Sequence, residues 1–350
     1  MNSSFRGSRG NSSQCYEFPT DRSFSIASFL TARTIRGPKR PTARYSPITN
    51  VAQRIRSTSI RVKSQRQSVI VTDLPEAKET RSFFEFGKPV MRTLKQRMAS
   101  GEFVRICGVG RMPHHNLIQI IGMSGGFHGL WFDMEHVGFS SQELEIATMA
   151  AREHGMDTFC RVAPTDYATV TRCLEAGSSG IMAAQIFTAE QAEEFVRWSK
   201  FSPRGWRGLN TGGWDAKFTM IPAAEFTRKA NEETFVAIQI ETLSAVEQCA
   251  AIAAIDGVDA LFVGPSDLSQ SLGVTGQFFH EKCLEAIDKI ANACRDVGKP
   301  WAAVTFNAKH AEMLVSKGCT MLSPTNDIRL AVAGVNAVKQ DFADLFSRNP

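Results

Sequence analysis

The stretch FVAIQIETLSAVEQCAAIAAIDGVDALFVG, residues 235–264, contains a complete strand–helix–strand unit. It opens with an apolar run (235–241) and closes with a second one (260–264), and an amphipathic segment of helical length joins them. Two strands that are joined by a helix are typical of neighbours in a parallel sheet. The stretch therefore predicts an α/β fold.

The same alternation of apolar runs and amphipathic segments continues from residue 102 to the C-terminus. The segments between the runs carry helix-start patterns, such as a Ser cap at Ser140 and a Thr-x-x-Gln capping box at Thr188. Eight such units in about 250 residues predict a (β/α)8 barrel of the TIM type. An open doubly wound sheet is the alternative, but GVGRMPHHN (108–116) is not the G-x-G-x-x-G turn typical of that fold. The expected strands are residues 104–109, 129–133, 158–162, 180–186, 235–241, 260–264, 301–305 and 320–323.

The overall composition is that of an ordinary globular protein. The 350 residues are 43% hydrophobic and 21% charged, enough apolar material for one large core or two smaller ones. The longest apolar runs are broken by Gly, Glu or Asp well before the roughly 20 residues that a membrane-spanning helix needs. Eight cysteines are scattered without a C-x-x-C pair, so we expect reduced thiols that pack as small apolar side chains. These features predict a cytoplasmic protein without a membrane segment.

Basic residues are concentrated near the N-terminus. Residues 1–70 hold thirteen of the 40 Lys and Arg and two of the 35 acids, which leaves 27 basic and 33 acidic residues in 71–350. Because that body is acidic, we expect no nucleic-acid partner. We expect residues 1–85 to be a disordered basic leader and residues 86–350 to be the barrel domain. The leader is consistent with an organelle presequence, a phosphate-binding arm, a tail without a role or a translation start assigned too far upstream.

Ionisable residues follow the second and third expected strands. The active site of a barrel lies at the C-terminal ends of its strands. LWFDMEHVG places Asp133, Glu135 and His136 there, although a single acid at such a place is more often a helix cap or a surface turn. An imidazole is the usual general base at neutral pH, so His136 is a candidate base. Arg161 lies within the apolar run TFCRVAP, where it serves either a structural ion pair or the carboxylate or enolate of a ligand.

Two further acids follow the fifth and sixth expected strands. Gln239 and Glu241 point to the same side of their strand because side chains alternate along it. Asp267 follows a Gly-Pro turn after the next strand. Two carboxylates on adjacent strand ends predict a site for Mg²⁺ or Mn²⁺, and two unrelated exposed acids are the alternative. The loop SPRGWRGLNTGGWDAKF (202–218) is either an ordinary surface loop or a cationic edge that attracts an anionic substrate.

From about Lys95 onward the sequence resembles the HpcH/HpaI class II aldolases, metal-dependent pyruvate aldolases built on a TIM barrel of the phosphoenolpyruvate/pyruvate-binding type. Arg161 after the third strand is part of the resemblance, and the last two of the motifs are the most diagnostic. The motifs in chain order are LKQRMASGE (94–102), DMEH (133–136), LEAGSSGIM (174–182), PRGWRG (203–208), IQIET (238–242) and GPSDLSQSLG (264–273). The leader has no part in the resemblance.

The resemblance implies a lyase that reversibly cleaves a 4-hydroxy-2-oxo acid into pyruvate and an aldehyde. The metal, Mg²⁺, Mn²⁺ or Co²⁺, would be held by Glu241 and Asp267 and would stabilise an enolate. Arg161 would add positive charge at the enolate oxygen. The remaining implied roles are proton transfer by His136, pairing of Glu175 with that histidine, and substrate orientation by Gln239, Ser266 and Asp133.

The resemblance also implies a homo-oligomer, a trimer or a hexamer, in which the last helix (329–346) packs on a neighbouring subunit. A monomer with that helix folded back is the alternative. This helix is apolar enough for either arrangement.

Several positions depart from the family's pattern. Glu175 stands where an Asp is common, Ala184 followed by Gln185 stands where the fourth strand usually ends in Pro, and Met134 replaces a Gly. The last strand ends in SPTND (323–327) in place of V-G-x-D. These departures indicate a shifted substrate preference or, in the extreme, lost turnover. The alternative functions are a CoA-ester lyase of the citrate lyase β or malyl-CoA type, and a non-catalytic oxoacid-binding barrel or RNA-associated protein.

Overall fold

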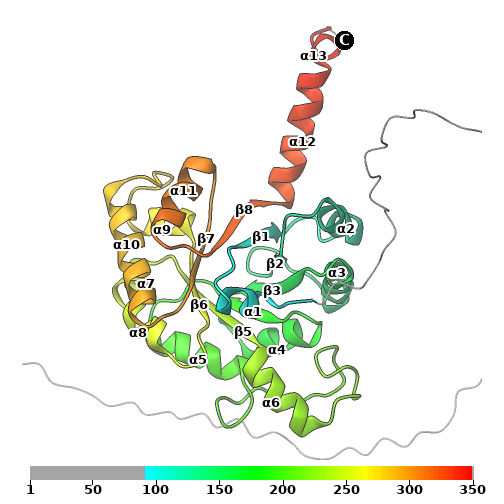
Figure 1. The fold of residues 1–350 in the computed structure, drawn as a ribbon, viewed down its shortest axis with the longest axis vertical. Helices are drawn as coiled ribbons and strands as arrows, with labels where there is room; N and C mark the ends of the chain where they lie inside the picture. Colours follow the sequence, from blue (N-terminus) through cyan, green and yellow to red (C-terminus); the bar gives the residue numbers. More distant parts are fainter. Residues whose placement is uncertain (1–90, 349–350) are drawn as a thin grey trace, which may run out of the picture. The chain divides into compact units, whose positions relative to one another are not determined.

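The computed structural model describes residues 91–348 as a closed parallel barrel surrounded by helices (Figure 1). Each strand pairs with its sequence neighbours, and β8 pairs with β1 to close the barrel. The predicted (β/α)8 fold is confirmed. The expected leader and the boundary at residue 85 lie outside the described residues. The strands are β1 Val104–Val109, β2 Gly129–Asp133, β3 Asp157–Val162, β4 Gly180–Ala183, β5 Phe235–Ile240, β6 Ala260–Val263, β7 Trp301–Val304 and β8 Met321–Asn326.

All eight predicted strands are present, with small differences at their ends. The largest differences are in β8, which continues to Asn326 instead of ending at Ser323, and in β4, which ends at Ala183 although the apolar run continues to Ile186. Ala184 still donates to the carbonyl oxygen of Val162, but Gln185 has a φ of 50°. A left-handed residue cannot continue a strand, so the chain turns there.

The helices begin where the sequence provides capping groups. Ser140 with Glu143 and Thr188 with Gln191 form complete capping boxes at the starts of α3 and α5, as the sequence predicts. The helices are α1 Leu94–Ala99, α2 His115–Ser124, α3 Ser141–Glu153, α4 Tyr167–Glu175, α5 Ala189–Ser199, α6 Ala223–Glu233, α7 Leu243–Glu247, α8 Cys249–Ala254, α9 Pro265–Ser271, α10 Glu281–Asp296, α11 Ala308–Ser316, α12 Asp327–Asp341 and α13 Ala343–Phe346. None of the helices in residues 91–348 is long and apolar enough to cross a membrane.

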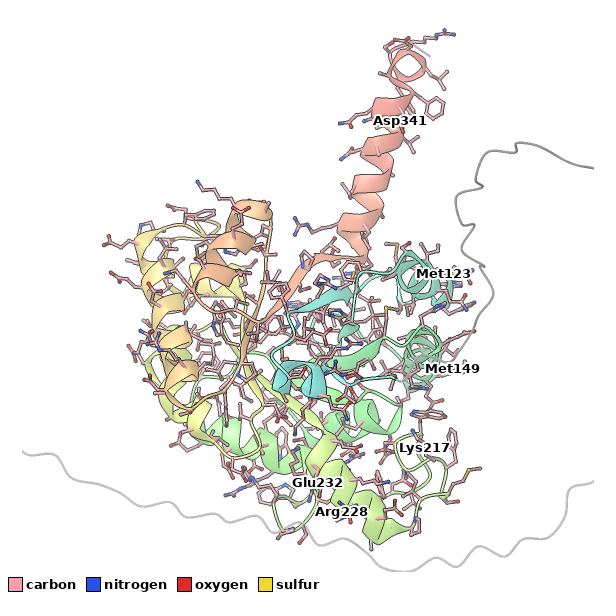
Figure 2. All side chains as sticks on the ribbon, viewed as in Figure 1. Met123, Met149, Lys217, Arg228, Glu232 and Asp341 are labelled. Atoms are coloured by element: carbon pink, nitrogen blue, oxygen red, sulfur yellow. The ribbon has the colours of Figure 1, made fainter. Side chains whose placement is uncertain are left out.

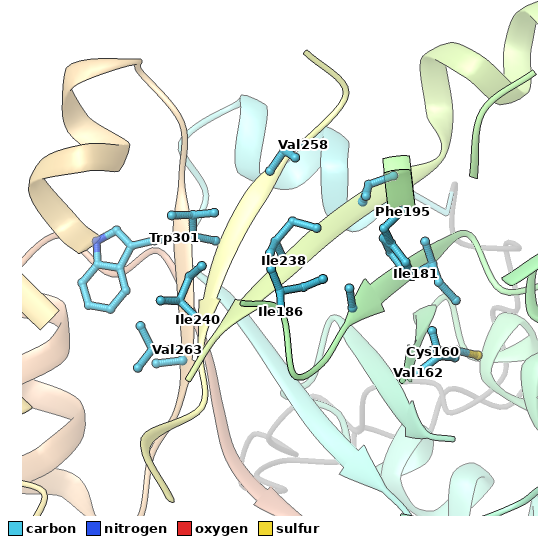
Figure 3. Close-up of a cluster of buried hydrophobic side chains, with 14 of the residues drawn as sticks. Cys160, Val162, Ile181, Ile186, Phe195, Ile238, Ile240, Val258, Val263 and Trp301 are labelled. Carbon is cyan, nitrogen blue, oxygen red and sulfur yellow. The ribbon is translucent and has the colours of Figure 1, made fainter. Parts of the chain in front are cut away.

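Two layers of apolar side chains form the core. The barrel interior is filled by large side chains such as Phe159, Phe235 and Phe262. A second layer lies between the strands and the surrounding helices and includes Ile238, Val263 and Trp301 (Figure 3). Because side chains fill its interior, the barrel is a rigid support for the groups at its strand ends rather than a pore. The seven cysteines in this part of the chain are buried and free, as the sequence predicts.

Helix α12 extends away from the barrel (Figure 1). Its first residue, Asp327, is buried and accepts hydrogen bonds from the backbone N–H groups of residues 110–112 at 2.7 to 2.9 Å, which fastens the start of the helix to the loop after β1. From residue 331 to residue 346 every side chain is exposed. The helix is therefore not folded back on its own barrel.

Candidate active site

Arg161 lies at the centre of the strand-end cluster. The register pairs Asp133 of β2 with Arg161 of β3, so their side chains meet at the same end of the barrel. The guanidinium is bound by both oxygens of Asp133, with Nη2 at 2.8 Å from Oδ2 and Nε at 3.2 Å from Oδ1. Its Cζ lies 5.0 Å from the centre of the Trp131 ring, and the Trp131 Nε1–H donates to Ser323 Oγ. A fork-to-fork ion pair on an aromatic face fixes the plane of the guanidinium.

Glu135 is a second acid beside Arg161. Its Oε2 lies 3.2 Å from Arg161 Nη1, yet this buried oxygen accepts no hydrogen bond within the described residues. Burial raises the pKa of Glu135, and the charges of Asp133 and Asp267 add to this effect, while Arg161 and His136 oppose it. The Glu135 carboxylate is thus close to four other ionisable groups. DMEH pointed to this residue, but the sequence alone assigned it no role.

His136 lies at the rim of the same cluster. Its backbone N–H donates to Asp133 Oδ1 at 3.2 Å, which holds the turn after β2. Its ring Nε2 lies 3.7 Å from Glu135 Oε2, and the side chain is 58% exposed. An imidazole that is both accessible and next to an acid is suited to proton exchange with a ligand.

Glu241 follows β5 and is 1% exposed. Its Oε1 accepts hydrogen bonds from the backbone N–H of Gln185 at 2.8 Å and from the side-chain Nε2 of the same residue at 3.2 Å. Its Oε2 accepts a hydrogen bond from Gln239 Nε2. Burial raises the pKa of Glu241 to about 7, and repulsion from Asp267 and Glu135 acts in the same direction. The charge of Arg161 lowers this pKa against the larger effect of burial, but Glu241 forms no ion pair within residues 91–348.

Asp267 and Ser266 lie in the first turn of α9, directly after Gly264 and β6. A Cβ on Gly264 would come within 2.4 Å of both Gln239 Nε2 and Glu241 Oε2, so only glycine leaves room for these side chains. Ser266 is exposed beside Asp267. Gln239 and Glu241 thus lie on the same side of their strand, as the alternation of side chains predicts, and the end of the next strand places Ser266 and Asp267 at the same end of the barrel.

The donor set of this cluster fits a hard divalent cation. Four carboxylates, those of Asp133, Glu135, Glu241 and Asp267, face one guanidinium, Arg161. Gln239 Oε1 is a buried oxygen without a hydrogen-bond donor among the described residues. No group of three or more His, Cys, Asp and Glu in residues 91–348 is arranged to hold a metal. Two carboxylates, those of Glu241 and Asp267, would leave positions on a cation open for water and a ligand, as is common for Mg²⁺.

Glu175 is not part of this cluster. It is the last residue of α4, and the chain from there leads into the N-terminal end of β4. Its surroundings are Gly213 and Trp214, whose backbone N–H donates to the Glu175 carbonyl. Because all strands are parallel, Glu175 lies at the opposite end of the barrel from His136, and the pairing expected from the family's pattern is not made within this chain.

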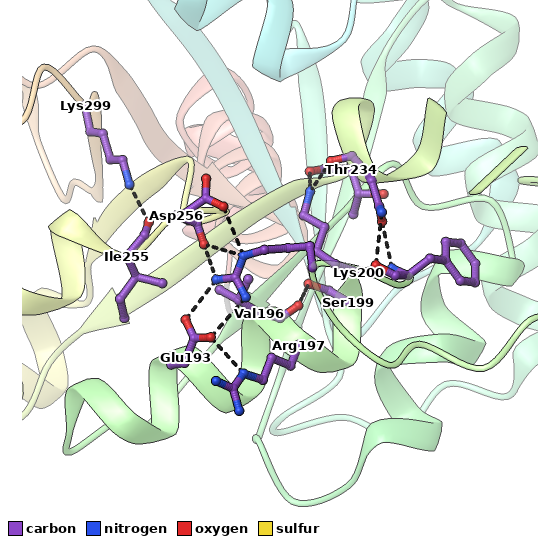
Figure 4. Close-up of polar contacts among 12 residues, drawn as sticks. Glu193, Val196, Arg197, Ser199, Lys200, Thr234, Ile255, Asp256 and Lys299 are labelled. Atoms are coloured by element: carbon purple, nitrogen blue, oxygen red, sulfur yellow. Dashed lines mark hydrogen bonds and ion pairs between the residues drawn. The ribbon is translucent and has the colours of Figure 1, made fainter. Parts of the chain in front are cut away.

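Part of the cationic loop before α6 lies at the other end of the barrel, where Gly213 and Trp214 lie beside Glu175, whereas Gly208 faces the ring of Tyr167 at the start of α4. Arg204 binds Glu193 at 2.8 Å and Asp256 at 3.2 Å, and Figure 4 shows these two acids at the centre of a polar network. Arg207 is buried and paired with Asp215. Within one chain these arginines form structural ion pairs, which favours the interpretation of this stretch as an ordinary surface loop.

A parallel barrel with ionisable side chains gathered at the C-terminal ends of its strands defines the class of TIM-barrel enzymes. Residues 113–333 match the family model described as HpcH/HpaI aldolase/citrate lyase. Since this match covers more than half of the chain, the protein belongs to that family, and the resemblance seen in its motifs is confirmed.

Several members of the family are similar along most of their length. A pyruvate aldolase of Rhizobium etli is 27% identical over 249 residues, which are 71% of this chain and 96% of that protein. A hydroxypyruvate/pyruvate aldolase of Delftia acidovorans is 30% identical over 59% of this chain and 76% of its own length. The crystal structure of an HpcH/HpaI aldolase from Desulfitobacterium hafniense superimposes with a TM-score of 0.66 at 29% identity, covering 71% and 96% of the two chains. These relatives support an enzyme of the aldolase kind.

Proposed function

We propose that the protein is a divalent-metal-dependent aldolase that reversibly cleaves a 4-hydroxy-2-oxo acid into pyruvate and an aldehyde. The observation that carries this proposal is the buried Glu241 carboxylate, which lies close enough to Asp267 and Glu135 for their charges to raise its pKa. Such a concentration of negative charge at strand ends is costly unless a cation shares the site, and a bound cation can in turn bind an anionic ligand. The similar pyruvate aldolase and hydroxypyruvate/pyruvate aldolase support an oxoacid ligand.

Glu241 and Asp267 would hold the metal, Mg²⁺, Mn²⁺ or Co²⁺. When bound there, the metal supplies Lewis acidity to the oxygen of the 2-oxo group. Gln239 orients the carboxylate of Glu241, and Asp133 orients the guanidinium of Arg161. Ser266 borders the same position and orients the substrate carboxylate.

Arg161 and His136 would carry the bond cleavage. Arg161 Nη1 stabilises the negative charge that develops on the 2-oxo oxygen, because electrostatic stabilisation of an enolate is strongest where donors are fixed beforehand. His136 accepts the proton of the 4-hydroxyl group as the bond between C3 and C4 breaks. The electron pair of that bond stays with C3 as the enolate of pyruvate, the aldehyde leaves, and protonation at C3 completes the reaction. We assign no role to Glu175 within the chain.

A coupled assay of pyruvate release tests the proposal. We expect pyruvate from at least one 4-hydroxy-2-oxo acid in the presence of Mg²⁺, Mn²⁺ or Co²⁺, and a loss of activity of at least 10²-fold, as an order of magnitude, after chelation. Release of acetyl-CoA from a CoA ester without pyruvate would favour the CoA-ester lyase instead. Binding of pyruvate or oxalate without turnover of any hydroxy-oxo acid would favour a non-catalytic barrel.

We further propose that the protein is a homo-oligomer in which α12 of one subunit packs on the next. Ile328, Val332 and Val335 lie on one face of α12 and are each at least 42% exposed, and Phe342, directly after the helix, is 56% exposed. A groove of about 830 Å³ lies between α2, α3 and the base of α12, and its lining is mostly apolar. Figure 2 shows Met123 on α2, Met149 on α3, and Asp341 far along the projecting α12.

A second copy is the occupant that fits this groove. The base of α12 forms one wall of it, so two copies related by a two-fold axis would each place a helix in the groove of the other. Each buried Val side chain would contribute about 1.5 kcal/mol to the association. This groove would then serve assembly rather than catalysis, because its lining includes none of the residues of the strand-end cluster.

Introducing charge on this face of α12 is expected to dissociate the oligomer. Sedimentation velocity should show the wild type as a dimer or a larger assembly and the double variant Val332→Asp/Val335→Asp as a monomer. Both side chains are exposed in the single chain, so the fold of each subunit should be unaffected. Ala333→Asp adds one negative charge on the opposite face of the helix and should leave the assembly intact. A wild type that is monomeric at micromolar concentration would contradict the proposed packing.

A further inference from the structure

Gln185 adopts a backbone conformation that glutamine rarely takes. It is one of four non-glycine residues with positive φ in residues 91–348, with φ at 50°, and the other three are consecutive residues of the loop before α6. A left-handed residue of this kind is retained where the surrounding contacts hold it, often at a functional site. The contacts made by Gln185 are with Glu241.

Both hydrogen-bond donors of Gln185 reach the same oxygen. The backbone N–H and the side-chain Nε2 donate to Glu241 Oε1 at 2.8 and 3.2 Å. A carboxylate oxygen offers about two acceptor positions, so Oε1 is saturated. The left-handed turn at Gln185 is what places both donors on one side of the carboxylate.

The other oxygen of Glu241, Oε2, accepts fewer hydrogen bonds than Oε1. Oε2 accepts a single hydrogen bond, from Gln239 Nε2, and therefore keeps one acceptor position open. It faces Gly264, which has no side chain to cover it. Oε1 of the carboxylate thus has no acceptor position left, whereas Oε2 has one position left for a further ligand.

We infer that Gln185 is a positioning residue that restricts Glu241 to binding a cation through Oε2 alone and thereby sets the metal selectivity of the site. The inference rests on the proposed metal site at Glu241 and Asp267. Ca²⁺ commonly takes six to eight oxygen ligands and often binds a carboxylate through both oxygens, whereas Mg²⁺ requires octahedral geometry and single-oxygen contacts. Because the two hydrogen bonds from Gln185 occupy Oε1, binding of Ca²⁺ is disfavoured relative to binding of Mg²⁺.

Titration calorimetry of metal-free protein with MgCl2, MnCl2 and CaCl2 tests this inference without an activity assay. Gln185→Met keeps the length of the side chain and the backbone N–H but removes the second donor to Oε1. We expect the ratio of the Ca²⁺ to the Mg²⁺ dissociation constant to fall about fivefold in this variant, the size of one net hydrogen bond. Gln142→Met, an exposed change in the first turn of α3, should leave the ratio at the wild-type value.

The outcomes separate this inference from the proposed function. An unchanged ratio in Gln185→Met, or an equal loss of affinity for all three ions, would overturn the role in selectivity. Gln185→Ala removes the same donor with a smaller side chain and gives the same answer if the Met variant does not fold. Metal binding that persists in Glu241→Ala would instead show that the proposed metal site itself is wrong.

Discussion

Replacement of Glu241 by alanine is expected to abolish divalent-metal binding and to lower pyruvate release by at least 10³-fold, as an order of magnitude. Glu241 is the most deeply buried acid of the strand-end cluster, and three hydrogen bonds fix its orientation. Without it a cation would keep only Asp267 as a proposed ligand, and a single carboxylate in water binds Mg²⁺ weakly. Calorimetry with MnCl2 and the coupled pyruvate assay measure the two effects on the same preparation.

Two further variants make this result specific. Glu247→Ala removes an exposed acid of the neighbouring helix α7 and should leave both metal binding and turnover at wild-type values. Glu241→Gln keeps the shape of the side chain but replaces the charge, so it should lose the metal as the alanine variant does. Retention of metal affinity within about threefold in either Glu241 variant would be incompatible with the site.

The barrel itself could be predicted from the sequence because its strands follow a simple rule. A buried parallel strand is a short apolar run, and each run in residues 104–326 is separated from the next by a capped, amphipathic helix. Alternation along β5 also placed Gln239 and Glu241 on one side correctly. The position of Asp133 beside Arg161 then follows from the register between β2 and β3.

Other features depend on contacts between distant segments and were not predictable. Nothing in the sequence near Gln185 indicates a left-handed turn, which exists because Glu241, 56 residues later, accepts both of its donors. Glu175 was expected beside His136 because of a family motif, but its place at the end of α4 directs it to the other end of the barrel. The apolar face of α12 was visible in the sequence, whereas its projection from the barrel was not.

Replacement of Arg161 by alanine is expected to lower the rate of pyruvate release by about 10² to 10³-fold while metal binding is retained. The guanidinium is the only cation that binds both Asp133 and Glu135 among the described ion pairs, so it is the one fixed positive charge next to the proposed metal. Its charge also lowers the pKa of Glu241, against the larger effect of burial. Removing it leaves the remaining acids less compensated, so the affinity for Mn²⁺ should stay the same or increase.

The same variant distinguishes a role in the reaction from a purely structural ion pair. If Arg161 only neutralised Asp133 and Glu135, its loss would lower the melting temperature, but the turnover of each folded molecule would remain near the wild-type value. We expect the opposite. Arg161→Ala should fold and bind the metal but turn over slowly at saturating substrate, because the charge that stabilises the enolate is missing. Arg161→Lys should recover part of the rate, since it restores a charge but not the fork that Asp133 holds. Arg172→Ala, an exposed change on α4, is the control for loss of an arginine. If the turnover of Arg161→Ala stays within about threefold of the wild-type value, Arg161 has only a structural role in the buried ion pair.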